Sequence, residues 1–224
     1  MEEQFCQLLE NEFSRYRFPL DTRQIEQLTI YRTELQRWNT HTNLTAITED
    51  SEIIYRHFLD SVSVLNHCNI RTGDSVVDIG TGAGFPGIVL KIYIPDIKLT
   101  LIEVSHKKVA FLRFLISQLG FDSSIKVCAE RAEICAQDDQ FVNSYDWVLT
   151  RYITSLDKSV KYCVPMLKTT GRWIAYKSKE TDREIQQSKD TLKEFGVEIR
   201  NVHKSNITHL NRSYIVISRT DIGN

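Results

Sequence analysis

Apolar residues in the first third of the chain recur every three or four positions. The series that starts at Ile25 predicts an amphipathic helix, capped by Asp21 or Thr22. A second series follows Ser51 and predicts another helix. Residues 38–45 (WNTHTNLT) lack this spacing and are rich in capping residues, so we expect them to connect the two helices.

From Arg71 onward, short β-branched runs alternate with amphipathic segments. The predicted strands are residues 75–79, 98–103, 125–128, 147–149, 173–176, 197–202 and 214–218, and the predicted helices are 88–93, 106–119, 160–167 and 181–195. This alternation predicts an α/β fold with a parallel, Rossmann-like sheet and helices on both faces. Only a polar loop separates the last two strands, which should form an antiparallel C-terminal hairpin. We therefore expect a helical N-terminal extension (1–70) packed on a main domain (71–224).

The composition is that of a globular protein. Hydrophobic residues make up 42% of the 224 residues and charged residues 25%, which argues against disorder. The 28 Lys and Arg residues are balanced by 29 Asp and Glu residues, for a formal net charge of -1. A wholly basic nucleic-acid binder is therefore excluded, whereas a local basic face is not.

Cysteine usage and the amino terminus favour a cytoplasmic protein. The five cysteines include no C-x-x-C pair and do not cluster in the sequence, so we predict neither disulfides nor a metal site, and treat all five as structural or incidental. The first residues (MEEQF) are acidic where a signal peptide is basic, and no apolar stretch approaches the roughly 18 residues that span a membrane. We expect a monomer without membrane or DNA partners.

A glycine cluster, residues 78–87 (DIGTGAGFPG), follows the first predicted strand and opens a helix. Ligands of open α/β sheets bind at the carboxyl ends of strands, and glycines there let the backbone turn sharply beside the ligand. The spacing Gly82-x-Gly84-x-x-Gly87 matches a dinucleotide pattern, although this match alone is weakly specific.

Asp78 favours a different nucleoside at this turn. A dinucleotide places a pyrophosphate over the turn, and a neighbouring carboxylate would repel it. S-adenosylmethionine has no phosphate and carries an ammonium and a sulfonium, which a carboxylate attracts. Glu103, at the end of the second predicted strand, has the position of an acid that binds ribose hydroxyls. NAD would use the same acid, and an ordinary solvated carboxylate is the alternative, so Glu103 does not choose between the two cofactors.

Several motifs together resemble one family. They are residues 43–47 (NLTAI), 56–61 (RHFLDS), 78–87, 105–112 (SHKKVAFL), 131–133 (RAE) and 150–151 (TR), in this order. Over roughly residues 35 to 180 the chain resembles the bacterial small-subunit ribosomal RNA guanine-N7 methyltransferases, the glucose-inhibited division protein B family.

The resemblance implies a seven-stranded class I methyltransferase fold and an S-adenosylmethionine cofactor. It implies a guanine in the decoding-region loop of 16S rRNA as the substrate, methylated at N7. The cofactor-binding residues that it implies are Gly80, Phe85, Glu103 (ribose), Ala132 and Glu133 (adenine) and Arg151. The glycine cluster itself adds Asp78, Gly82 and Gly84 to the predicted cofactor-binding residues. The chain departs from the family at Tyr152, where alanine is typical, and at Ser178 and Glu130, where glycine is common. We expect a differently shaped pocket wall near Tyr152 and Lys177.

The chemistry of N7 methylation agrees with the residues present. Guanine N7 presents a lone pair with no proton to remove, so no general base is required. Residues 150–153 (TRYI) lack the proline-rich motif of amine methylases. Catalysis can rest on positioning, which contributes roughly 7–11 kcal/mol, and we assign positioning roles to Arg151 and Lys177.

Basic residues are expected to bring in the RNA. Residues 151–183 include eight lysines and arginines but only three acids. Lys179 is one of these basic residues and Glu180 one of the acids. Positively charged side chains bind the phosphates of an RNA, and aromatic rings stack on its bases. The predicted RNA-binding residues are Arg56, His57, Lys107, Lys108 and Lys177, with Tyr16, Tyr152 and Tyr176 available for stacking. For Arg56 and His57 the alternative is an internal contact with Asp60 or a helix cap.

Three other functions stay open at this point. The chain could methylate another RNA site or a protein, or it could be an inactive ribosome-binding module. A nicotinamide oxidoreductase is disfavoured because no suitable hydride-relay His or Tyr-x-x-x-Lys pair is evident.

Overall fold

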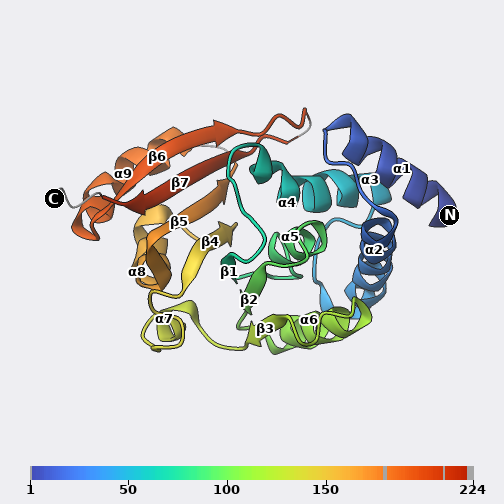
Figure 1. The fold of residues 1–224 in the computed structure, drawn as a ribbon, viewed down its shortest axis with the longest axis horizontal. Coiled ribbons are helices and arrows are strands. Elements are labelled where there is room, and N and C mark those ends of the chain that lie inside the picture. Colours follow the sequence, from blue (N-terminus) through green and yellow to red (C-terminus); the bar gives the residue numbers. More distant parts are fainter. Residues whose placement is uncertain (1, 179–180, 209, 221–224) are drawn as a thin grey trace.

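The computed structural model describes residues 2–178, 181–208 and 210–220, and its centre is a single seven-stranded sheet (Figure 1). The strand order is β3-β2-β1-β4-β5-β7-β6. The strands are β1 (Ser75–Ile79), β2 (Lys98–Ile102), β3 (Ile125–Cys128), β4 (Tyr145–Arg151), β5 (Leu167–Lys177), β6 (Val197–Lys204) and β7 (Ser213–Arg219). Strands β1 to β5 pair in parallel, and β7 pairs antiparallel with both β5 and β6. The predicted α/β sheet with an antiparallel terminal hairpin is confirmed.

Helices cover both faces of this sheet (Figure 1). The side chains of β1 alternate between the two faces, because Val76 belongs to one hydrophobic cluster and Val77 to the other. The first cluster is covered by α5 (Gly87–Tyr93), α6 (His106–Gln118) and the N-terminal helices, and the second by α7 (Ala132–Cys135), α8 (Leu156–Met166) and α9 (Thr181–Glu194). No helix in the described part of the chain is long and apolar enough to cross a membrane.

The N-terminal helices α1 (Glu2–Arg15) and α2 (Thr22–Thr42) share the first cluster with the sheet. Asp21 caps α2 through a reciprocal capping box with Gln24. The helix extends through most of the predicted connector 38–45 and ends at Asn43, which has a left-handed φ of 49°. The prediction was wrong there because the Trp38 ring packs on two phenylalanines of α6, and this packing outweighs weak local helix propensity.

The helix predicted after Ser51 is present but irregular. It consists of α3 (Asp50–Ile53), the π-helical η1 (Ile54–Leu59), α4 (Asp60–Val62) and the 3-10 turn η2 (Ser63–Asn66). π-Helical turns are frequent at functional sites because the wider turn redirects side chains. Here the irregular segment faces the carboxyl end of β4.

Candidate active site

The glycine turn joins β1 to α5 at the carboxyl edge of the sheet. The amides of Gly80 and Thr81 donate to the carbonyl of Ile102, at 2.8 and 3.2 Å. Gly80 has a φ of +64°, and a Cβ there would lie 2.9 Å from Ile153 Cδ1. Gly82 also has a positive φ, +63°, but no described atom lies within 4 Å of its Cβ position. The turn is therefore packed at Gly80 and open for a ligand at Gly82.

Asp78 lies under the turn and holds it to α5. Its Oδ2 accepts hydrogen bonds from Thr81 Oγ1 (2.6 Å) and from the amide of Gly87 (2.8 Å). Its Oδ1 is buried and has no hydrogen-bond partner within the described residues. Burial raises the pKa of Asp78 to about 6, although the bonds from Thr81 and Gly87 and the charge of Arg151 act in the opposite direction. The carboxyl group is thus mostly ionised at neutral pH.

Glu103 links the glycine turn to the start of α6. Its Oε2 accepts the Gly82 amide and its Oε1 accepts the Ser105 amide, both at 2.9 Å. The side chain is buried by these contacts. Each carboxylate oxygen can accept more than one hydrogen bond, so Glu103 retains capacity for a ligand hydroxyl.

A hollow of about 140 Å³ lies beside Glu103. It brings together four predicted cofactor residues, Gly80, Glu103, Ala132 and Glu133. Its remaining lining residues are Ile79, Ile102, Val104, Glu130, Arg131, Ile153 and Tyr162. A larger hollow of about 800 Å³ is at the opposite edge of the sheet, near Ser75 and Lys98. We place the site at the smaller hollow, because parallel sheets bind ligands at the carboxyl ends of their strands.

Of the five predicted cofactor residues that do not line this hollow, Phe85 and Gly84 pack against the N-terminal part of the chain. Phe85 is buried between the rings of Tyr31 and His57, with centroid distances of 5.0 and 4.3 Å. A Cβ on Gly84 would lie 2.7 Å from Tyr31 Oη. Phe85 and Gly84 therefore attach the turn to α2 and η1 through packing, and the predicted cofactor contacts of these two residues stay predictions.

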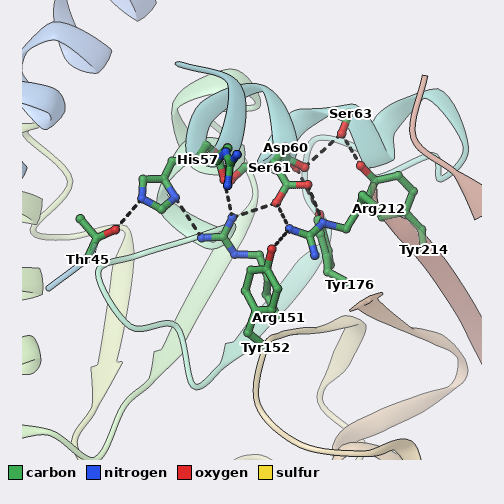
Figure 2. Close-up of polar contacts among 12 residues, drawn as sticks. Thr45, His57, Asp60, Ser61, Ser63, Arg151, Tyr152, Tyr176, Arg212 and Tyr214 are labelled. Atoms are coloured by element: carbon green, nitrogen blue, oxygen red, sulfur yellow. Dashed lines mark hydrogen bonds and ion pairs between the residues drawn. The ribbon is translucent and has the colours of Figure 1, made fainter. Parts of the chain in front are cut away.

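Asp60 is the centre of a buried charge cluster at the end of β4 (Figure 2). The Asp60 carboxylate is 0% exposed and accepts two hydrogen bonds from Arg212, both 2.7 Å, and one of 3.0 Å from Arg151 Nη1. Arg151 Nη1 also donates to the Arg56 carbonyl at 3.2 Å. Asp60 raises the pKa of Arg212 further above its usual value, against the effect of burial. Two cations on one carboxylate leave a net positive charge there.

Arg212 was not predicted as a site residue, and Asp60 was predicted only as an internal partner of Arg56 or His57. Arg56 instead forms an ion pair with Glu52 and is exposed. The RHFLDS motif was the signal that could have drawn attention to Asp60, whereas Arg212 belongs to no recognisable motif.

His57 is 7% exposed, so the predicted RNA contact does not fit its position. Its Nε2 is 2.9 Å from Thr45 Oγ1, and its Nδ1 is 3.5 Å from Arg151 Nη2 (Figure 2). Burial and the charge of Arg151 lower the pKa of His57 to about 3. The ring is therefore neutral and can accept from Arg151, which it helps to orient.

The predicted lysines divide into engaged and exposed side chains. Lys177 donates to the Thr154 carbonyl at 2.6 Å and pairs with Glu184 at 2.7 Å, so its charge is used inside the protein. Lys107 is exposed and Lys108 is half-buried in the first turn of α6, beside the hollow. Lys179 and Glu180 lie outside the described residues.

The aromatic residues and cysteines bring two corrections. Of the three tyrosines expected to be available for stacking, Tyr16 and Tyr176 are buried, and Tyr176 donates to the Ser61 carbonyl at 3.1 Å. Only Tyr152 among them is exposed. The cysteines, which do not cluster in the sequence, include a pair that meets in space, because the Sγ atoms of Cys128 and Cys135 are 3.4 Å apart.

The fold is shared with solved methyltransferases. A ribosomal protein L11 methylase from Lactobacillus delbrueckii subsp. bulgaricus has a TM-score of 0.55 and 15% identity, covering 72% of this chain and 77% of that one. A SAM-dependent methyltransferase from Aquifex aeolicus has a TM-score of 0.54 and 16% identity, covering 70% and 91%. With the glycine turn at the carboxyl edge of the sheet, the fold is that of the class I methyltransferases.

Sequence comparison identifies the family. The model of the family described as rRNA small subunit methyltransferase G (GidB) matches residues 24–213. The ribosomal RNA small subunit methyltransferase G of Alkaliphilus metalliredigens is 39% identical, over 80% of this chain and 74% of that protein. The one of Caldanaerobacter subterraneus subsp. tengcongensis is 38% identical, over 99% and 93%. The chain belongs to this family of S-adenosylmethionine-dependent rRNA methyltransferases, and the resemblance seen in its motifs is confirmed.

Proposed function

We propose that the chain transfers the methyl group of S-adenosylmethionine to N7 of a guanine in the decoding-region loop of 16S rRNA. The observation that carries this proposal is the family match over residues 24–213, which includes both the hollow and the Asp60 cluster. We further propose that the protein acts as a cytoplasmic monomer on the small ribosomal subunit or its RNA.

The hollow has the donors and acceptors that the cofactor needs. Glu103 would accept from the ribose hydroxyls, and Ala132 and Glu133 would border the adenine. The open face of Gly82 leaves space for the rest of the molecule, and the unpartnered Oδ1 of Asp78 is an acceptor under the turn. When bound, the cofactor supplies a methyl group on a positively charged sulfur.

The acceptor needs no proton removed. The N7 lone pair forms the new bond to carbon, the sulfur–carbon bond breaks, and its electron pair returns to sulfur, so the positive charge moves to the guanine. His57 is neutral and occupied with Arg151, and it is not required as a base. Arg151, held by Asp60 and the Arg56 carbonyl, presents a fixed cation for positioning at the end of β4.

Methylation of subunits tests this proposal. The purified protein is incubated with radiolabelled S-adenosylmethionine and either 30S subunits or naked 16S rRNA from cells that lack the modification. Borohydride–aniline cleavage followed by reverse transcription should then give one stop, at a guanine of the decoding-region loop. Label in ribosomal protein, or a stop elsewhere in the RNA, would indicate a different acceptor, and no label in either substrate would favour the inactive binding module.

A further inference from the structure

Tyr152 combines a strained backbone with an exposed ring. It directly follows β4 and has a φ of 55°, a left-handed conformation that side chains with a Cβ rarely adopt. Its side chain is 68% exposed, although tyrosine is a large apolar residue. Strain at a residue beside a candidate site is often retained for function, so this outlier calls for a role.

The ring is fixed rather than free. The Tyr152 hydroxyl accepts a hydrogen bond from Arg212 Nη2, and the Arg212 guanidinium lies 4.4 Å from the ring centroid (Figure 2). Arg212 is itself held by two hydrogen bonds to Asp60. The Arg151 guanidinium lies 5.7 Å from the same centroid. The ring is thus held by the arginine pair while most of its surface faces solvent.

The neighbours of Tyr152 place it at the mouth of the cofactor hollow. The next residue, Ile153, lines that hollow and packs against Gly80. Val104, on the same lining, is 55% exposed. Tyr152 therefore lies between the hollow and the Asp60 cluster, on the edge where an acceptor base must approach.

We infer that the exposed face of the Tyr152 ring stacks on the acceptor nucleobase and holds it in line with the methyl donor. This inference rests on the proposed function. Enzymes that modify bases commonly unstack the target and hold it against aromatic side chains. The fixed ring is ordered before binding, which reduces the entropy lost when the base is captured. Tyr152 thus holds the substrate in position, and its partner is a nucleobase rather than a phosphate.

Kinetics of Tyr152→Phe and Tyr152→Leu test the inference. Stacking on one base accounts for about 5- to 150-fold in affinity, so Tyr152→Leu should raise KM for 30S subunits by at least about 5-fold. Tyr152→Phe keeps the ring and should stay within about 3-fold of wild type. The Kd for S-adenosylmethionine should be unchanged in both variants. Val202→Ala, at an exposed apolar residue on β6, serves as the surface control and should leave both the KM and the Kd unchanged.

A fluorescent base separates stacking from a structural role. In an RNA stem-loop with 2-aminopurine at the target position, the bound state should be dimmer with wild type and Tyr152→Phe than with Tyr152→Leu. If wild type methylates the guanine but Tyr152→Leu has an unchanged KM and equal bound fluorescence, Tyr152 only covers Arg212 and the inference is wrong. If wild type does not methylate the guanine at all, the proposed function fails instead.

Discussion

At the residue scale, the buried carboxylate of Asp60 holds two arginines of the candidate site in position. It is fully buried and neutralises one of two arginines that meet at the end of β4. Removal of the carboxylate would leave two buried guanidinium groups without a counter-charge, and breaking a buried pair in this way costs about 3–5 kcal/mol. Arg151 and Arg212, and through Arg212 the Tyr152 ring, depend on it.

We expect Asp60→Asn to lower the free energy of unfolding by about 3–5 kcal/mol and to abolish methylation. Urea denaturation followed by circular dichroism measures the first effect. Glu52→Gln is the matched control, because Glu52 forms an exposed ion pair with Arg56, and such pairs contribute roughly 0–1 kcal/mol. Equal losses in the two variants would contradict the role given to Asp60.

His57 predicts a pH dependence of stability. Its pKa is lowered from 6.5 to about 3 in the folded protein, so below pH 6.5 the unfolded chain binds a proton that the native ring does not. The stabilisation from His57 is complete above pH 6.5 and is lost as the pH falls toward 3, by up to about 1.4 kcal/mol per pH unit. Asp78, whose pKa is raised to about 6, acts with the opposite sign between pH 3.8 and 6.

The comparison of His57→Gln with wild type isolates this contribution. Wild type should lose about 1–2 kcal/mol more than His57→Gln between pH 6.5 and 5, measured as the free energy of unfolding in urea. His106→Gln, at an exposed histidine of α6, should follow wild type. Parallel curves for wild type and His57→Gln would mean that His57 has the same pKa in the native and unfolded states, which contradicts its lowered pKa in the fold.

The residue scale also shows where prediction from sequence ends. Glu103 was found from its position at the end of a predicted strand, and residues 132 and 133 from a family motif. The fold brings all three to one hollow. Arg212 was missed because its partner, Asp60, precedes it by 152 positions, and no local pattern records such a contact. His57 was misassigned because a sequence does not report burial, and burial decides that its imidazole is neutral.

At the scale of elements, two glycines allow the effect of a substitution on stability to be distinguished from its effect on ligand binding. Gly82 and Gly120 both have a positive φ, +63° and +72°, and neither has a described atom within 4 Å of its Cβ position. An alanine therefore meets the same backbone strain at both positions, roughly 1–2 kcal/mol. Only Gly82 adjoins Glu103 and the hollow.

Gly82→Ala and Gly120→Ala should thus lose similar stability in urea denaturation, whereas only Gly82→Ala should weaken S-adenosylmethionine binding, by at least 10-fold. Isothermal titration calorimetry measures the binding. Gly82→Ala should also lose methylation and keep its affinity for 30S subunits. Unchanged cofactor affinity in Gly82→Ala would exclude the open face of the turn as the binding surface.

Elements were predicted with the most success where the pattern is local. The strands form at the β-branched runs, because a strand buried in a parallel sheet reads as a short apolar run in the sequence. The end of α2 was predicted wrongly because long-range packing of Trp38 decides it. The π-helical turn of η1 could not be predicted, because the spacing of its apolar residues does not differ from that of an α-helix.

At the scale of the whole molecule, the N-terminal helices and the sheet share one hydrophobic cluster, which extends from Phe5 to Val216. The predicted boundary between two parts of the chain at residue 70 stays a prediction. Helices α1 and α2 bury their apolar faces against the elements that follow, so both predicted parts share this core. A shared core predicts one cooperative unfolding transition rather than two.

Phe13→Ala tests this cooperativity. Phe13 is fully buried in α1, so its truncation should lower the free energy of unfolding by about 3–5 kcal/mol. The whole thermal transition should shift, both in circular dichroism and in the fluorescence of the sheet residues Trp147 and Trp173, measured in a Trp38→Phe background because Trp38 lies in α2. An early transition in circular dichroism, with an unshifted second one in fluorescence, would reveal an independently folding extension.

The bond between Asp60 and Arg212 has a consequence for biosynthesis. The two residues are joined late, because a translating ribosome adds Arg212 152 residues after Asp60. Until then the nascent polypeptide contains Asp60 and Arg151 but not the second guanidinium or the support for Tyr152. A product truncated before Arg212 would therefore have the glycine turn but neither the second guanidinium on Asp60 nor the hydrogen bond that supports Tyr152.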